Sequence, residues 1–191
     1  DIPKDVQFAK AKYTKIKKDK KLNGKIQNKF NQKDIDQLIN LMIKASKPVF
    51  YTGGGVINSG PKASELLREL VSLTGFPITS TLQGLGAYPG DDNQFLGMLG
   101  MHGTYEANLA MHQSDLMICV GARFDDRITG KVSGFSPKSK KIHIDIDASS
   151  FNKSVSVDLS IQGDIAKTLS KINNILEHKK ILFPQSRYKK W

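Results

Sequence analysis

Apolar residues recur at helical spacing in three segments of the chain, which predicts three amphipathic helices. The first follows Asn31, which with Asp34 three residues later is typical of a helix N-terminus. The second opens at Gly60-Pro61 and ends at Gly75, because proline favours the first helical position and glycine follows the last turn. The predicted buried faces are Ile35, Leu38, Ile39 and Met42, then Ala63, Leu66, Leu67 and Leu70, and finally Ile165, Leu169, Ile172 and Leu176.

Short apolar runs between these segments predict β-strands. The runs lie at residues 48–51, 76–79, 116–120, 142–146 and 155–161, the last two with alternating apolar positions. Residues 116–120 are apolar on both faces, as a central parallel strand is. Residues 105–113 predict a further helix, and the stretch 82–103 is dotted with glycines.

This alternation of strands and helices predicts an α/β fold. We expect a Rossmann-like sandwich with a parallel sheet of about five or six strands and helices on both faces. Ligands of such sheets bind outside the carboxyl ends of the strands, so the residues at those ends are the candidate site. They are Gly53-Gly54-Gly55, Thr81-Leu82-Gln83-Gly84, Gly121-Ala122-Arg123, Asp145-Ile146-Asp147 and Gly163-Asp164. Their glycine, hydroxyl, guanidinium and carboxylate groups suit a large nucleotide that carries phosphates.

The glycine triplet has a structural interpretation beside the binding one. It could be only a tight turn, or its backbone N–H groups could approach a phosphate. It departs from the G-x-G-x-x-G pattern, and Pro61 stands where a Walker A sequence needs its lysine. Kinase or GTPase chemistry is therefore disfavoured.

The polar clusters leave similar alternatives open. Arg123 and Arg127, with the residues between them, could form a surface ion-pair loop or grip a pyrophosphate or carboxylate. Asp145 and Asp147 could accept hydrogen bonds from ribose hydroxyls or cap a short helix. His102 has no metal-ligand neighbour at the right spacing, so we predict no metal site.

Composition narrows the class of protein. The 191 residues contain one cysteine, Cys119, which excludes an internal disulfide and is expected to be a small buried side chain. No run of 18 apolar residues and no signal peptide is visible. The chain begins with Asp1, and we expect it to be a piece of a longer protein.

The net charge of +11 lies at the two ends of the chain. Residues 1–47 carry +8, residues 48–137 carry −3, and residues 138–191 carry +6. Nearly all the excess is lysine, in runs such as residues 15–21. A solvated linker is the favoured interpretation of that run, over an arm that binds nucleic acid, because arginine is scarce and no nucleic-acid-binding motif is present.

Taken in order, the segments resemble the central domain of the acetolactate synthase (acetohydroxyacid synthase) catalytic subunits. The matching text is KPVFYTGGGV, STLQGLGAYP, FLGMLGMHGTYEAN, VGARFDDRITG, KIHIDID and a late QGD. The likeness covers about residues 31–178, and the opening DIPKDVQ resembles the end of the preceding domain. The strings LGMLGMHG and GARFDDR are the most diagnostic.

The resemblance implies a fold of the DHS-like NAD/FAD-binding type and an enzyme of branched-chain amino acid biosynthesis. Such enzymes are transferases that condense two pyruvates, or pyruvate and 2-oxobutyrate, with thiamine diphosphate and Mg²⁺. They also hold an FAD that takes no net part in the reaction. The resemblance implies that the FAD binds in this domain, whereas thiamine diphosphate and Mg²⁺ bind through domains outside this chain.

The resemblance also implies a domain layout. Residues 1–30 would be the end of the preceding domain and a Lys-rich linker, residues 31–180 the FAD-binding domain, and residues 181–191 a linker toward a C-terminal domain. The implied partners are those flanking domains, other catalytic subunits in a homodimer or homotetramer, and a regulatory small subunit, with no nucleic acid and no membrane. The implied location is the cytoplasm of a bacterium, or a plastid.

Site residues carry over position by position. The implied FAD-binding set is Gly53, Gly54, Gly55, Thr81, Leu82, Gln83, Leu99, Gly100, Met101, His102, Gly121, Ala122, Arg123, Asp125, Arg127, Ile128, Asp145, Ile146, Gly163, Asp164 and Ile165. Met101, His102, Asp126 and Arg127 would border the substrate channel. No catalytic residue and no metal ligand is expected in this chain, which we expect to be inactive alone.

Two alternatives remain at this stage. One is the central domain of another thiamine-diphosphate-dependent decarboxylase or oxidase, which the GARFDDR string disfavours. The other is a basic domain that binds nucleic acid through its Lys-rich ends. Release of a yellow flavin on denaturation would favour the acetolactate synthase interpretation, and salt-dependent retention on DNA would favour the nucleic-acid one.

Overall fold

The structure is a computed structural model that describes residues 2–12 and 31–184. The predicted linker at residues 10–30 and the predicted tail at residues 181–191 lie mostly outside the described residues. A short helix, α1 (Lys4–Phe8), buries no side chain. No helix in the described ranges is both long and apolar enough to cross a membrane.

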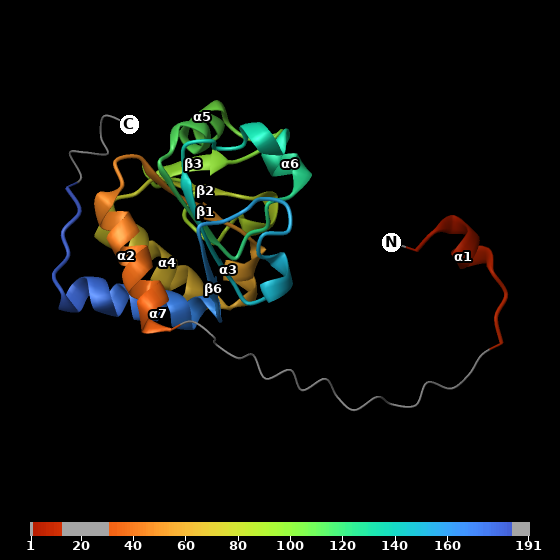
Figure 1. Ribbon diagram of the computed structural model, residues 1–191, viewed down its shortest axis with the longest axis horizontal. Helices are drawn as coiled ribbons and strands as arrows, with labels where there is room; N and C mark the ends of the chain where they lie inside the picture. Colours follow the sequence, from red (N-terminus) through yellow and green to blue (C-terminus); the bar gives the residue numbers. More distant parts are fainter. Residues whose placement is uncertain (1, 13–30, 185–191) are drawn as a thin grey trace.

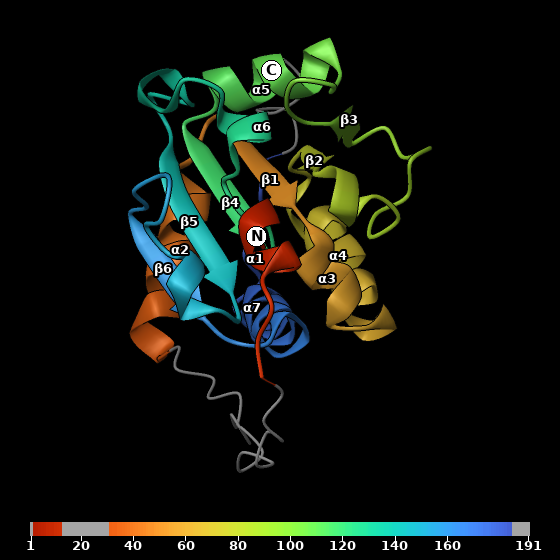
Figure 2. The ribbon, with the colours of Figure 1, turned by 90° about the vertical axis from the view of Figure 1, so that its right-hand side faces the viewer.

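Residues 31–184 fold around a parallel sheet with helices on both faces (Figure 1, Figure 2). The strands of this described region are β1 (Pro48–Thr52), β2 (Ile78–Ser80), β3 (Phe95–Met98), β4 (Leu116–Val120), β5 (Lys140–Asp145) and β6 (Leu159–Gln162). They lie in the order β3-β2-β1-β4-β5-β6, and each neighbouring pair is parallel. This is the order of doubly wound dinucleotide-binding sheets, and it confirms the predicted α/β sandwich.

Three long helices cover one face of the sheet: α2 (Gln32–Lys44), α4 (Pro61–Thr74) and α7 (Ile165–His178). Every residue of their predicted apolar faces is buried. The capping box at the start of α2 is also confirmed, because Asn31 Oδ1 accepts the Asp34 N–H at 2.9 Å and Asp34 Oδ2 accepts the Asn31 N–H at 3.2 Å. Gly75 ends α4 in the left-handed conformation, with φ of 70°.

The other face carries α5 (Tyr105–Gln113), which was predicted, and several short elements that were not. The short helices that the sequence did not predict are α3 (Gly54–Asn58), α6 (Asp126–Thr129), η1 (Leu82–Gly84), η2 (Val132–Gly134) and η3 (Ala148–Ser150). Of these, α3 packs against α4 and α7 on the first face. Helices of three to five residues are too short to show a hydrophobic period. The central strand β4 is buried along its whole length, as predicted, and Cys119 lies in its interior.

Some predicted strand boundaries were wrong. Ile146 lies outside β5, because the Asp145 side chain accepts the Asp147 N–H at 2.8 Å and the chain bends there. Val155 and Val157 precede β6, although Val155 is buried. The glycine-dotted stretch 82–103 contains the unexpected edge strand β3, whose residues are only partly buried and which includes Gly97 at φ of 88°.

The chain beyond α7 returns to the core instead of leaving it at once. Phe183 is 8% exposed and packs edge-on against the fully buried Phe76, with ring centroids 5.2 Å apart. Leu182 beside it is 90% exposed. Residues 181–184 therefore contribute one aromatic side chain to the cluster between the sheet and α2, α4 and α7.

We expect Phe183→Ala to lower the free energy of unfolding by about 3 kcal/mol, the lower end of the range for a buried phenylalanine. Leu182→Ala is the matched control and should change it by less than about 0.5 kcal/mol, because its side chain is exposed. Urea unfolding of both variants measures the difference. Equal effects would mean that Phe183 does not belong to the core.

Candidate functional site

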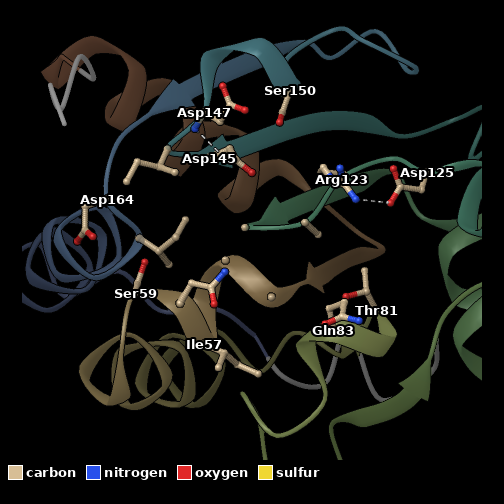
Figure 3. A pocket seen from close by; sticks show the side chains of 17 residues that line it. Ile57, Ser59, Thr81, Gln83, Arg123, Asp125, Asp145, Asp147, Ser150 and Asp164 are labelled. Carbon is tan, nitrogen blue, oxygen red and sulfur yellow. Dashed lines mark hydrogen bonds and ion pairs between the residues drawn. The ribbon is translucent and has the colours of Figure 1, made fainter. Parts of the chain in front are cut away.

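A cavity of about 740 Å³ opens at the carboxyl ends of the strands. It is lined by residues that follow β1, β2, β4, β5 and β6, so five chain segments far apart in sequence meet there (Figure 3). The strand order reverses between β1 and β4, and the turns after these two strands both line the cavity. Doubly wound sheets bind their ligands at such a switch point.

Most of the described residues that line the cavity were predicted from the strand ends. Twelve of the seventeen belong to the FAD-binding set that the resemblance implied: Gly54, Gly55, Thr81, Gln83, Gly121, Ala122, Arg123, Asp125, Asp145, Ile146, Asp164 and Ile165. The other five are Ile57, Asn58, Ser59, Asp147 and Ser150. The first three belong to α3 and its end, where the sequence predicts only a turn. Asp147, which the sequence did name as a strand-end candidate, is the N-cap of η3. Ser150, which no pattern singled out, is the last residue of η3.

Nine predicted binding residues do not line this cavity. They are Gly53, Leu82, Leu99, Gly100, Met101, His102, Arg127, Ile128 and Gly163. Leu99 is buried in the core between the sheet and α5, and Gly53, the first residue of the glycine turn, is buried as well. Met101 and His102 lie on the loop after β3, and Arg127 lies in the short helix α6. These three residues are called the loop group below, and the predicted residues that line the cavity are the cavity group.

The turns after β1 and β4 are in direct backbone contact. The Gly55 N–H donates to Gly121 O at 2.8 Å, and the Gly53 N–H donates to Val120 O at 3.1 Å. A Cβ atom on Gly55 would lie 2.7 Å from the Gly121 Cα, and one on Gly121 would lie 2.8 Å from the Gly55 Cα. Both residues are therefore glycine because the two turns leave no room for a side chain. The tight-turn interpretation is correct for Gly53 and Gly55, and it does not exclude binding, because Gly54 and Gly55 also line the cavity.

Arg123 brings a positive charge to the cavity. Its guanidinium pairs with Asp125, Nη2 to Oδ2 at 3.2 Å, and both side chains stay largely accessible. A buried side chain of β1 holds its backbone, because the Tyr51 hydroxyl donates to Arg123 O at 2.9 Å. Burial raises the pKa of the Tyr51 phenol well above its ordinary value, so the hydroxyl keeps its proton and remains a donor.

Asp145, the last residue of β5, and Asp147, two residues later, divide the roles that the sequence left open. Asp147 caps η3, because its carboxylate accepts both the N–H and the hydroxyl of Ser149, at 2.9 and 2.8 Å. These bonds lower the pKa of Asp147. Asp145 accepts the Asp147 N–H with one oxygen, and its side chain lines the cavity. Asp145 is therefore the better candidate for a hydroxyl of the ligand.

The polar groups of the cavity are unevenly distributed. Figure 3 shows Asp145 and Asp147 along one wall, Asp164 and Ser59 at one end, and Arg123 and Asp125 on the opposite side with Thr81 and Gln83. Carboxylates can accept from hydroxyls, while the guanidinium suits a phosphate. No group of three or more metal-ligating side chains is found within the described residues.

The loop after β3 and the short helix α6 bring Met101 and Arg127 together. The Met101 N–H donates to Arg127 O at 3.0 Å, and Asn108 of α5 bonds both the N–H and the carbonyl of Gly100. A Cβ on Gly100 would lie 2.7 Å from Arg127 O. The Arg127 side chain is 73% exposed, and its Nε lies 4.0 Å from Asp126 Oδ2, too far for a strong bond. Asp126 instead accepts the backbone N–H of Arg127 at 3.0 Å.

Comparison with known sequences decides the family. Residues 35–172 match the sequence profile described as thiamine pyrophosphate enzyme, central domain. The chain belongs to this family. The six-stranded parallel sheet is consistent with a thiamine pyrophosphate enzyme central domain.

The relatives of this thiamine pyrophosphate enzyme central domain include acetolactate synthases, as the motifs indicated. The acetolactate synthase large subunit of Buchnera aphidicola subsp. Schizaphis graminum is 40% identical over 183 residues, which are 94% of this chain and 32% of that protein. The chloroplastic enzyme of Arabidopsis thaliana is 40% identical over 181 residues, 94% of this chain and 26% of that protein. The acetolactate synthase of Mycobacterium avium is 43% identical over 178 residues, which are 93% of this chain and 28% of that protein. The chain thus spans about a quarter to a third of the curated relatives it matches.

We expect Gly121→Ala to destabilise this central domain more than Gly130→Ala does, by about 1–3 kcal/mol. Both glycines have positive φ, 58° and 53°, so both variants strain the backbone. Only at position 121 would the new methyl group meet backbone atoms, because nothing lies within 4 Å of a Cβ at Gly130. Urea unfolding compares the two variants. Equal losses would show that the contact between the turns does not matter for stability.

Proposed function

We propose that this chain is the FAD-binding central domain of an acetolactate synthase. The observation that carries the proposal is the cavity at the β1–β4 switch point, which collects glycine backbone, one guanidinium and several carboxylates in one place. About 40% identity to acetolactate synthases over nearly the whole chain supports it. The full-length protein would condense two 2-oxo acids, pyruvate with pyruvate or with 2-oxobutyrate, in branched-chain amino acid biosynthesis.

The donors and acceptors of the cavity fit FAD. Arg123 and the backbone of Gly54 and Gly55 would hold the diphosphate, which needs positive or N–H groups. Asp145 would accept a ribose hydroxyl. Ile57, Ile146 and Ile165 offer apolar surface to a flat ring. The volume of about 740 Å³ lies within the range of roughly 300–1,000 Å³ usual for ligand pockets.

The loop group fits the proposed condensation of two 2-oxo acids, because its residues would border the substrate channel. Met101, His102 and Arg127 would border the path of the incoming 2-oxo acid, with the exposed Arg127 guanidinium available for its carboxylate. Thiamine diphosphate, held with Mg²⁺ by domains outside this chain, would supply the chemistry that forms the carbon–carbon bond. This chain would then position FAD and form one wall of the channel.

The relatives support further parts of the proposal. One of them is named a large subunit, which supports a partner small subunit and a multidomain catalytic chain that forms a homodimer or homotetramer. Bacterial and chloroplastic proteins both occur among them, which supports a bacterial cytoplasm or a plastid as the location.

Flavin analysis of the full-length protein tests the FAD assignment. Heat or acid should release one FAD per chain, identified by its absorbance and fluorescence. Purified full-length protein that condenses pyruvate but neither contains nor takes up flavin would overturn the assignment.

Arg123→Lys and Arg127→Lys should separate the two groups of residues in the full-length enzyme. Lysine keeps the charge and loses the planar fork, which removes a charge-assisted hydrogen bond of about 1.5–3 kcal/mol, or roughly ten- to a hundred-fold in affinity. We expect Arg123→Lys to weaken FAD binding by that factor. Arg127→Lys should leave FAD affinity within about three-fold and lower kcat/KM for the second 2-oxo acid instead. If Arg127→Lys weakened FAD binding and Arg123→Lys lowered only kcat/KM, the division into a cavity group and a loop group would be wrong.

The 191-residue chain alone should form no acetolactate when thiamine diphosphate, Mg²⁺ and FAD are supplied. The reason is that its relatives are three to four times longer and the described residues hold no metal-binding cluster. A colorimetric acetoin assay on the purified chain measures this directly. Any turnover above the protein-free control would contradict the expectation.

A further inference from the structure

His143, on β5, is a fully buried side chain next to the cavity, and the proposed FAD contacts do not use it. It is 0% exposed. Its ring packs edge-on against Phe124 and Phe151, with centroids 5.3 and 5.0 Å away. A leucine, methionine or phenylalanine could serve such packing equally well, so packing alone does not explain an imidazole here.

The hydrogen bonds of the ring explain better why a histidine stands at this position. Its Nε2 lies 2.8 Å from Ala122 O, and because a carbonyl only accepts, Nε2 carries a proton and donates. Its Nδ1 is buried and finds no hydrogen-bond partner among the described residues. An unpaired buried nitrogen lowers stability, and an apolar residue would avoid that loss. What histidine adds at this position is therefore the bond to Ala122.

This bond belongs to a set that holds one turn. Cys119 Sγ also donates to Ala122 O, at 3.1 Å, and the Tyr51 hydroxyl donates to the next carbonyl, Arg123 O. On the other side, Gly121 is locked against Gly55. The backbone from which the Arg123 side chain extends is thus held both by the glycine turn and by three buried side chains.

The same imidazole also lies next to the cavity carboxylate. Asp145 is two residues along β5, on the same face, and its Oδ2 lies 3.7 Å from His143 Nε2. The Asp145 side chain is only 13% exposed. One buried ring therefore contacts both the carbonyl of Ala122, in the peptide bond that leads to Arg123, and the carboxylate of Asp145. Arg123 and Asp145 both line the cavity.

We propose that His143 is a positioning residue, whose Nε2–H fixes the Ala122–Arg123 turn so that Arg123 and Asp145 face the ligand in one arrangement. The identity of the ligand as FAD rests on the proposed function. The fixing of the turn does not, because it depends only on contacts within this chain.

Asn173 of α7 is a chemically matched control. It is 1% exposed, its Nδ2 donates to the carbonyl of Leu66 at 3.0 Å, and its Oδ1 is buried without a hydrogen-bond partner among the described residues. It differs from His143 in place, because it joins α7 to α4 and does not line the cavity. Asn173→Leu therefore removes a similar buried bond without touching the Ala122–Arg123 turn.

The test compares His143→Leu, His143→Met, His143→Gln and Asn173→Leu in the full-length protein. Glutamine places an N–H as many bonds from the backbone as Nε2 of histidine, so it can restore the bond to Ala122. The two apolar variants cannot, and the flexible methionine covers the case in which leucine does not fold. Two quantities are measured without substrate: hydrogen exchange of the peptide covering residues 119–125, and the Kd for FAD.

We expect the apolar variants to exchange residues 121–124 at least ten-fold faster and to bind FAD at least ten-fold more weakly. His143→Gln should stay within about three-fold of the wild type on both measures. Asn173→Leu should lower Tm as the apolar variants do, yet leave exchange and Kd unchanged. The inference would be overturned if the apolar variants had a lower Tm than the wild type but the same hydrogen-exchange rate at residues 121–124. His143 would then be only a packing residue.

The outcome separates this inference from the proposed function. A wild-type protein that binds no FAD would refute the FAD site, and the exchange data would still decide whether His143 holds the turn. A wild-type protein that binds FAD, with variants that exchange and bind as it does, would refute the positioning role alone.

Discussion

The contact between the turns after β1 and β4 is the constraint around which the cavity is built. These adjacent parallel strands end at the same edge of the sheet, and there the chain leaves toward α3 on one side and toward Arg123 on the other. Gly55 and Gly121 allow the two backbones to meet through a hydrogen bond of 2.8 Å with no side chain between them. The close approach brings glycine backbone and a guanidinium into one cavity, which separate turns with Cβ atoms could not do.

The rest of the site consists of groups that hold these turns in place. Buried side chains of β1, β4 and β5 donate to the carbonyls of Ala122 and Arg123 from inside the protein, and the other side of the turn lines the cavity. Burial raises the pKa of the Cys119 thiol as it does that of Tyr51, so both side chains keep the protons they donate. In this structure the shape of the cavity depends on the core beneath it as much as on the residues that line it.

The helices and the topology could be predicted because their signals are local or general. The helix from Gln32 to Lys44 carries its own cap and apolar face, and the alternation of strands and helices limits the sheet to parallel arrangements. The edge strand β3 could not be predicted, because its four residues are only partly buried and include a glycine at positive φ. Phe183 could not be placed either, since a single aromatic residue after a helix carries no periodicity.

The candidate site was predictable to the extent that it consists of strand ends. Parallel strands bring their carboxyl ends together, so the sequence by itself predicts that Arg123 and Asp145 lie near each other. Sequence spacing does not reveal which aspartate caps η3, because that depends on hydrogen bonds of the folded chain. For the same reason it does not reveal that Arg127 lies away from the cavity. His143 had no signal of its own, because a histidine inside an apolar strand looks like a core residue until its partner, Ala122 O, is seen.

A crystal structure of the full-length protein grown with FAD tests the central claim most directly, because it shows which groups contact each part of the cofactor. The account predicts diphosphate density against Gly54, Gly55 and Arg123, with a ribose hydroxyl on Asp145. FAD bound away from the β1–β4 switch point, with the cavity filled only by water, would contradict it.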